Sequence, residues 1–169
     1  MAMSMGHTVS TPTEFPILPA PVKGLAMKTV RQLLESKGHE VVSIAADKSV
    51  FDAMQLMATR NIGAVLVLDA GNKLVGIVTE RDYARNMYML NKSATDVPIT
   101  VIMTQQVAYV RPQQTNEDCM ALITEKRVRH LPVLEDGQVI GLLSIGDMVK
   151  DAISEKDFII HELENYIRR

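Results

Sequence analysis

The chain repeats one pattern twice, and this internal repeat constrains its fold more than any other feature. Residues 41–69 align with residues 107–135 without a gap, a period of 66 residues. After a one-residue deletion in the second copy the match resumes, and 76–82 lies over 141–147. Such a period is too long for an ordinary solenoid repeat, and two copies are too few for an array. The repeat therefore predicts two small domains of one design that pair with each other.

The composition is typical of a compact soluble protein. The chain has 169 residues, of which 47% are apolar and 22% charged, and its net charge is −2. This charge predicts no general attraction to nucleic acid or to an anionic membrane. The longest apolar run, 62–68, is far shorter than the roughly 20 residues that span a bilayer. We expect neither a membrane anchor nor, from the polar, proline-containing N-terminus, a secretory signal. The single cysteine, Cys119, excludes an internal disulfide and favours a cytoplasmic location.

The order of segments suggests five regions. Four of the seven prolines fall in the first 24 residues, which we expect to form a flexible arm. The apolar stripe near the C-terminus, made of Ile159, Leu163, Tyr166 and Ile167, predicts an amphipathic helix. The expected regions are the arm (1–24), a first repeat with a leading helix (25–90), a linker (91–100), a second repeat (101–153) and a C-terminal amphipathic helix (154–169).

Each repeat has the apolar periodicity of a β-α-β-β-α unit, which predicts a mixed α/β (α+β) fold. A helix over 29–37 that ends at Gly38 precedes the first unit. The first unit is expected to contain strand 41–44, a helix from Ser49, strands 64–68 and 74–78 around a turn at 70–72, and a helix from Thr79. The second is expected to contain strand 107–110, a helix from Thr115, strands 131–134 and 139–143 around a turn at 136–137, and a helix from Ser144. One such unit buries little surface alone, so we expect the two to share a core.

Two copies of Gly-apolar-apolar-Ser/Thr-x-x-Asp, at 76–82 and 141–147, resemble the CBS domain signature. Residues 129–133 (Arg-His-Leu-Pro-Val) and 101–104 (Val-Ile-Met-Thr) also resemble segments of that family. The resemblance covers about 29–153. It implies that the two repeats pack sheet to sheet as a pseudo-twofold Bateman module. It also implies a non-catalytic regulatory or signal-transduction role, with an adenine nucleotide (AMP, ADP, ATP or NAD) bound between the repeats.

The motif makes chemical sense as a nucleotide site. A Ser or Thr at a strand-to-helix junction lies beside unpaired backbone N–H groups, which favour a phosphate. An Asp one turn later can accept two hydrogen bonds from the vicinal hydroxyls of a ribose. We expect Gly76 and Gly141 to leave space for a ligand to approach closely.

The same spacing has a purely structural interpretation, because Ser/Thr-x-x-Asp is also a helix-capping pattern. From spacing alone each copy is more often a cap than a binding site. Only the second and fourth copies follow the glycine of the family motif. The four copies are Ser49/Asp52, Thr79/Asp82, Thr115/Asp118 and Ser144/Asp147.

The family resemblance implies two clefts, each combining the motif of one repeat with early strands of the other. One cleft would use Ser144 and Asp147 for phosphate and ribose, with the base framed by Val42, Ile62, Gly63 and Ala64. The other would use Thr79 and Asp82 together with Ala108, Val128 and Arg129. For phosphate the best-placed side chains are Arg129 and His130, with Arg81 a weaker candidate. The less favoured alternative for His130 is an interior or interface histidine. Because Gly63-Ala64 stand where Arg129-His130 occur, the two clefts should differ in affinity or ligand.

Other chemistry finds little support in the sequence. The four histidines have no metal-ligand spacing, and there is no P-loop, so we expect no metal site and no enzyme. Cys119 lies in an apolar helix pattern and is expected to be a structural thiol. We expect a homodimer and an unidentified protein target, but no nucleic acid. Two alternatives stay open: an interaction protein with vestigial clefts, and a nucleotide-processing enzyme.

Overall fold

The computed structural model describes residues 28–167, except for the side chains of 159, 162, 163 and 165–167. The predicted arm over 1–24 and the side chains of the C-terminal stripe therefore lie outside the described residues. The described chain forms two compact units. Unit 1 contains residues 42–107, and unit 2 contains residues 28–41 and 108–167. None of the helices in this part of the chain is long and apolar enough to cross a membrane.

Unit 1 is built on a three-stranded sheet in the order β1-β2-β3. Strand β1 (Ser43–Ala45) pairs parallel with β2 (Ala64–Leu68), which pairs antiparallel with β3 (Leu74–Thr79). The predicted hairpin turn is confirmed: Asn72 has φ 62°, and the Asp69 carboxylate accepts hydrogen bonds from the backbone N–H groups that follow it. A short side-chain acceptor thus stabilises the turn locally.

The helices of unit 1 begin where the sequence predicts. Helix α2 (Val50–Arg60) is capped by Ser49, and α3 (Glu80–Leu90) by Thr79. A 3₁₀ turn, η1 (Ile99–Val101), completes the unit. The apolar face of α2 lies against the sheet, as the helical spacing predicts. The core includes Val50, Ala53, Met57, Val65, Val67, Val78 and Ile99.

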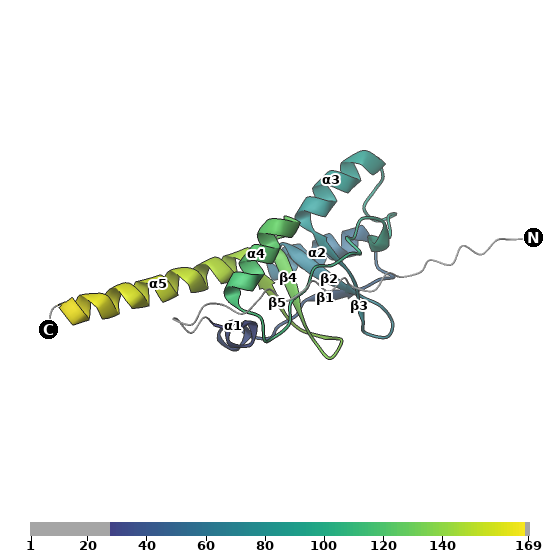
Figure 1. The fold of residues 1–169 in the computed structure, drawn as a ribbon. Helices are drawn as coiled ribbons and strands as arrows, with labels where there is room; N and C mark the ends of the chain where they lie inside the picture. The colour runs from purple at the N-terminus through teal and green to yellow at the C-terminus, as the bar shows by residue number, and fades with distance from the viewer. Residues whose placement is uncertain (1–27, 168–169) are drawn as a thin grey trace, which may run out of the picture. The chain divides into compact units, whose positions relative to one another are not determined.

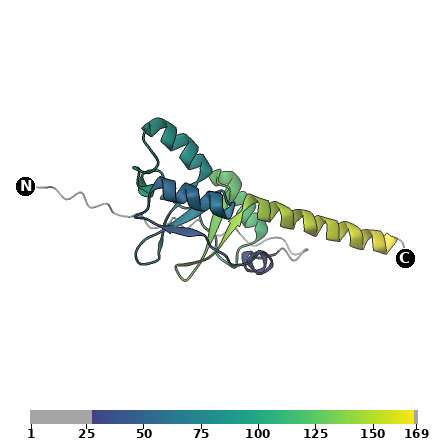
Figure 2. The same cartoon turned by 180° about the vertical axis from the view of Figure 1, so that it is seen from behind.

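Unit 2 contains a two-stranded hairpin and three helices (Figures 1 and 2). Strands β4 (His130–Glu135) and β5 (Gln138–Ser144) are joined by Asp136 and Gly137, with φ 50° and 76°. Two consecutive residues with positive φ are what a tight hairpin turn requires, and an Asp-Gly pair adopts them readily. The predicted turn is therefore confirmed. The helices are α1 (Val30–Lys37), α4 (Asn116–Lys126) and α5 (Ile145–Ile167).

One predicted element of the second repeat is wrong. The expected strand over 107–110 is reduced to one bridge between Val110 and Val133. The residues that follow pair with α1, since the carbonyl groups of Pro112 and Gln114 accept hydrogen bonds from Arg31 N and Val30 N. Residues 154–167 of the expected C-terminal helix are helical and belong to α5, which runs without a break for 23 residues from Ile145. Its C-terminal half extends beyond the other elements of unit 2 (Figures 1 and 2).

The two repeats exchange the segments that precede them. Residues 28–41, the first leading segment, come before unit 1 in sequence but pack in unit 2, where Leu33 and Leu34 are buried. Residues 96–104, the second leading segment, pack in unit 1, where Thr104 and Ile77 exchange two backbone hydrogen bonds. The expected regions 25–90 and 101–153 follow the sequence repeat, whereas the compact units each contain the leading segment of the other repeat.

Candidate functional site

The Thr79/Asp82 motif forms a capping box at the start of α3. The hydroxyl and backbone N–H of Thr79 donate to Asp82 Oδ2 at 2.7 and 2.8 Å. The backbone N–H of Asp82 donates to Thr79 Oγ1 at 3.2 Å. This arrangement satisfies N–H groups that a helix otherwise leaves without partners. The capping role of the motif is therefore confirmed at this position.

The Ser144/Asp147 motif repeats this geometry at the start of α5. The hydroxyl and backbone N–H of Ser144 donate to Asp147 Oδ2 at 2.8 and 2.7 Å. In both motifs only Oδ2 is used, and Oδ1 accepts no hydrogen bond from the described residues. A carboxylate has about four lone-pair sites. The capping role therefore leaves each aspartate with acceptor capacity for a ligand.

The two motifs outside the glycine pattern are capping boxes as well, at Ser49/Asp52 and Thr115/Asp118. For Asp52, the hydrogen bonds from the Ser49 backbone and side chain lower the pKa, and a smaller desolvation effect opposes them. The geometry of the cap alone does not distinguish the four positions. These two caps are therefore suitable controls for the other two.

The expectation that the glycines leave room for a ligand is wrong. A Cβ added at Gly76 would lie 2.5 Å from Met103 Sδ, and one at Gly141 would lie 2.5 Å from Leu34 Cδ2. In each unit the side chain that fills this space comes from the leading segment. The glycines thus serve the packing of those segments, which the sequence motif does not reveal.

Within each unit the first strand of the hairpin, β2 or β4, starts beside the capped helix. In unit 1, Ala64 pairs with Thr79, and the Gly63 carbonyl accepts a hydrogen bond from Glu80 N at 3.2 Å. In unit 2, His130 pairs with Ser144, and the Arg129 carbonyl accepts one from Ile145 N at 2.9 Å. The structure thus brings Gly63 and Ala64 to Thr79, and Arg129 and His130 to Ser144.

The other predicted residues are divided between the units. In unit 1 the Val42 carbonyl accepts a hydrogen bond from Leu66 N, Ile62 packs against the core, and Arg81 lies in the first turn of α3. In unit 2 Ala108 is buried and Val128 packs against the core. The family-derived grouping of each motif with strands of the other repeat stays a prediction.

Sequence reasoning missed Lys37, which ends α1. Its Nζ donates to Asp147 Oδ2 at 2.5 Å and to the Leu142 carbonyl at 2.6 Å. Burial by itself would raise the pKa of Asp147, but hydrogen bonds from Lys37 and Ser144 outweigh it and lower that pKa. A lysine in the last turn of a helix is a common favourable placement. No other pattern in the sequence indicates this contact, whose two residues lie 110 positions apart.

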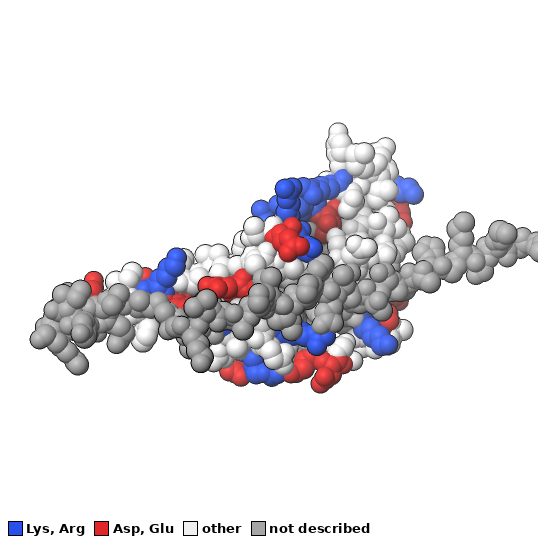
Figure 3. Space-filling view, viewed as in Figure 1, with Lys and Arg blue, Asp and Glu red and all other residues white. Residues whose placement is uncertain are grey.

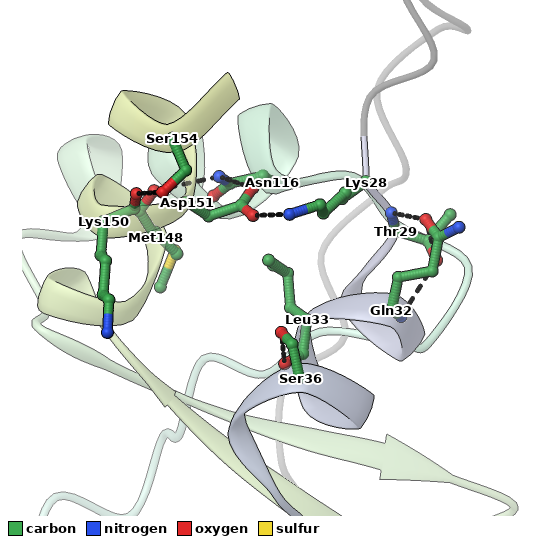
Figure 4. Close-up of polar contacts among 10 residues, drawn as sticks. All are labelled: Lys28, Thr29, Gln32, Leu33, Ser36, Asn116, Met148, Lys150, Asp151 and Ser154. Carbon is green, nitrogen blue, oxygen red and sulfur yellow. Dashed lines mark hydrogen bonds and ion pairs between the residues drawn. The ribbon is translucent and has the colours of Figure 1, made fainter. Parts of the chain in front are cut away.

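A second cluster lies one turn further along α5 (Figure 4). Lys28 Nζ donates to Asp151 Oδ1 at 2.6 Å, and Asn116 Nδ2 donates to Asp151 Oδ2 and to the Met148 carbonyl, both at 3.0 Å. Asp151 is only 8% exposed. These contacts join the first leading segment, α4 and α5 into one structure.

The described residues offer little other chemistry. They contain no group of three or more His, Cys, Asp or Glu side chains that could hold a metal ion. Cys119 is fully buried, and its burial, assisted by the nearby Asp118 charge, raises the pKa of its thiol to about 12. A thiol so rarely ionised is a poor nucleophile.

The face drawn in Figure 3 carries both basic (Lys, Arg) and acidic (Asp, Glu) side chains.

The family follows from comparison with known proteins. The CBS domain model matches residues 30–88 and 96–154. The chain belongs to the CBS domain family. It carries a tandem pair of these domains, a regulatory module, and it has the mixed α+β fold of such pairs.

Relatives include the mitochondrial CBS domain-containing protein CBSX3 of Arabidopsis thaliana, 33% identical over 153 residues, or 86% of this chain and 74% of that protein. Five further Arabidopsis relatives match over only 23–27% of their own length. The crystal structure of the CBS domain of NE2398 is 66% identical, with a TM-score of 0.73 over 76% of this chain and 99% of that one. Another solved structure is that of a putative signal-transduction protein with CBS domains from Burkholderia ambifaria, which is 46% identical. Its TM-score is 0.71 over 75% of this chain and 95% of that one.

A more distant structure shares the fold alone. It is the CBS domain pair of MJ0100, which is 21% identical and has a TM-score of 0.68 over 77% of this chain and 99% of that one. That domain pair was crystallised with 5′-methylthioadenosine and S-adenosyl-L-methionine.

Proposed function

We propose that this CBS pair binds an adenine nucleotide (AMP, ADP, ATP or NAD) without turning it over, and reports the occupancy to a protein partner. The observation that carries the proposal is the unused Oδ1 of Asp82 and Asp147, each held by a capping box at a helix start. A rigidly held carboxylate with spare acceptor capacity suits the vicinal hydroxyls of a ribose. The adenosine-derived ligands of the MJ0100 pair are consistent with this ligand class.

The phosphate would lie near groups that donate or carry positive charge. Ser144 and Thr79 stand at helix N-termini, where the helix dipole favours an anion. Arg129 and His130 flank Ser144, whereas Gly63 and Ala64 flank Thr79. The site at Ser144 should therefore prefer the more highly charged nucleotide. Arg81 stays a weaker candidate for phosphate.

Binding would act as a switch by population shift. A nucleotide that binds one conformation more tightly stabilises that conformation, and only by the difference in affinity. The partner would be a protein that distinguishes the two conformations. We also propose a homodimer, supported by apolar side chains of α5 that are exposed, Ile153 at 55% and Phe158 at 67%. A buried, unreactive Cys119 fits the proposed cytoplasmic location.

The test is calorimetric titration of the protein with AMP, ATP and NAD. We expect saturable binding that Asp82→Ala or Asp147→Ala weakens. Asp52→Ala and Asp118→Ala are matched controls, because each removes the same kind of cap without the glycine motif. They should lower the free energy of unfolding, because the capping box is lost, and leave nucleotide affinity unchanged. Absence of heat and of a thermal shift with every nucleotide would refute the proposal.

The vestigial-site alternative has one observation in its favour, since both aspartates already have a structural role as caps. Mass spectrometry of small molecules released from the purified protein separates the two. A retained adenylate supports binding, and no adenylate together with no titration heat supports a pure interaction protein. Chromatography of nucleotide incubated with the protein checks for turnover, which we do not expect.

A further inference from the structure

Two lysines of the first leading segment tie the two ends of α1 to α5. Lys28, before the helix, bonds to Asp151 at 2.6 Å, and Lys37, its last residue, bonds to Asp147 at 2.5 Å. The two aspartates are four residues apart, so they occupy one face of α5. The position of α1 on unit 2 therefore depends on two carboxylates of a single helix.

The two ties are not equivalent. Asp151 is 8% exposed and is also held by Asn116, so its ion pair is closed to a ligand. The side chains of Lys37 and Asp147 are 36% and 28% exposed. Moreover, Asp147 is the carboxylate that the proposed function assigns to the ribose. Only the tie at the C-terminal end of α1 can therefore exchange its partner for a ligand.

Lys37 and a ligand would compete for the same group. Asp147 Oδ2 already accepts hydrogen bonds from Ser144 N, Ser144 Oγ and Lys37 Nζ. The ammonium also compensates the carboxylate charge, which weakens the carboxylate as an acceptor for neutral hydroxyls. Ribose hydroxyls that donate to Asp147 therefore bind more strongly once the Lys37 contact is loosened.

Unit 1 lacks this competitor. Counted from the starts of the two family matches, at 30 and 96, Met103 corresponds to Lys37, although over the glycine it takes the place of Leu34. Met103 is apolar and packs over Gly76. No lysine or arginine among residues 28–167 forms an ion pair with Asp82. The two aspartates therefore differ in charge compensation although their caps are alike.

We infer that Lys37 is a built-in competitor at Asp147, so that nucleotide binding there is linked to release of the C-terminal end of α1. The inference rests on the proposed function and specifies how binding at Asp147 is regulated. The linkage is reciprocal: the Lys37 contact weakens binding at Asp147, and binding at Asp147 loosens the Lys37 contact. Residues 38–41, which follow α1, connect it to unit 1.

The test isolates the Asp147 site by working in an Asp82→Ala background. Calorimetric titration with AMP compares this protein with the double variant Asp82→Ala/Lys37→Met, in which the side chain matches Met103. Partly exposed ion pairs shift equilibria by about two- to fivefold, so we expect AMP affinity to rise by that factor. Lys37→Arg keeps the charge and should leave affinity low. Lys28→Met, the control that removes the other tie, should leave affinity unchanged.

Hydrogen exchange provides a second readout. In the Asp82→Ala protein AMP should accelerate exchange at the C-terminal end of α1, and this effect should be absent once Lys37 is Met. Equal or weaker AMP binding by the Lys37→Met variant overturns the inference while the proposed function stands. Absence of AMP binding to the wild-type protein overturns the proposed function, and the inference with it.

Discussion

Replacing Gly141 by alanine should loosen the first leading segment from unit 2. The added Cβ would lie 2.5 Å from Leu34 Cδ2 and 2.7 Å from Cδ1, about 1 Å inside ordinary van der Waals contact. Leu34 is fully buried in the core of unit 2, so it has no free volume into which to move. Overpacking of this kind costs about 1–3 kcal/mol. In a chain of this size each kcal/mol lowers the melting temperature by about 2–4 °C.

The assay is urea unfolding followed by far-UV circular dichroism, arranged as a double-mutant cycle with Leu34→Ala. The single Leu34→Ala change should cost about 2–5 kcal/mol because it leaves a cavity. In the double variant the new methyl group at 141 occupies part of that cavity. We therefore expect the double variant to be more stable than the sum of the single changes predicts, by at least about 1 kcal/mol.

Two controls separate this contact from general effects of glycine replacement. Gly146→Ala, in α5, places its Cβ at an ordinary 3.6 Å from Ser144 Oγ and should be neutral or stabilising by up to about 1 kcal/mol. Gly76→Ala meets Met103, whose flexible side chain can move aside, so it should cost less than Gly141→Ala. A Gly141→Ala protein as stable as wild type, or strict additivity in the cycle, would refute the packing of Leu34 on Gly141.

Three further predictions follow from unit 2. The pKa of Asp147 is lowered from 3.8 in the folded state, so its stabilising contribution is complete above that value and is lost as pH falls through the folded pKa. At neutral pH the free energy of unfolding in urea should be larger for the wild type than for Lys37→Met, and this difference should narrow below about pH 4. A difference that widens in acid would contradict this. Asp151→Ala should lower the free energy of unfolding by about 1–3 kcal/mol, because it leaves buried Asn116 without one acceptor. The control Asp157→Ala, at an exposed position of α5, should change it by less than about 0.5 kcal/mol. Equal effects of the two changes would contradict a stabilising role of the Asp151 cluster. Cys119 should resist iodoacetamide in the native protein and react after unfolding, because its pKa is raised to about 12; rapid labelling of the folded chain would contradict the buried thiol.

Local patterns in the sequence were sufficient for the capped helices and the hairpins. Ser49, Thr79 and Thr115 cap helices that start at the next residue, because Ser/Thr-x-x-Asp satisfies the first N–H groups within four residues of chain. The Asp136-Gly137 turn likewise follows from two residues that tolerate positive φ. The expected strand over 107–110 failed for the opposite reason. A strand needs a partner along its length, and within 107–110 the structure bridges Val110 alone, to Val133.

The sequence by itself also determined the family and the two repeated motifs, since both depend on residue identity and spacing. Only the tertiary structure decided what surrounds those motifs. Leu34 and Met103 fill the spaces over the two glycines, and Lys37 reaches Asp147. These contacts arise because each leading segment packs in the unit of the other repeat. No local pattern encodes that exchange, because its free energy comes from burial and charge pairing between residues that lie far apart in the chain.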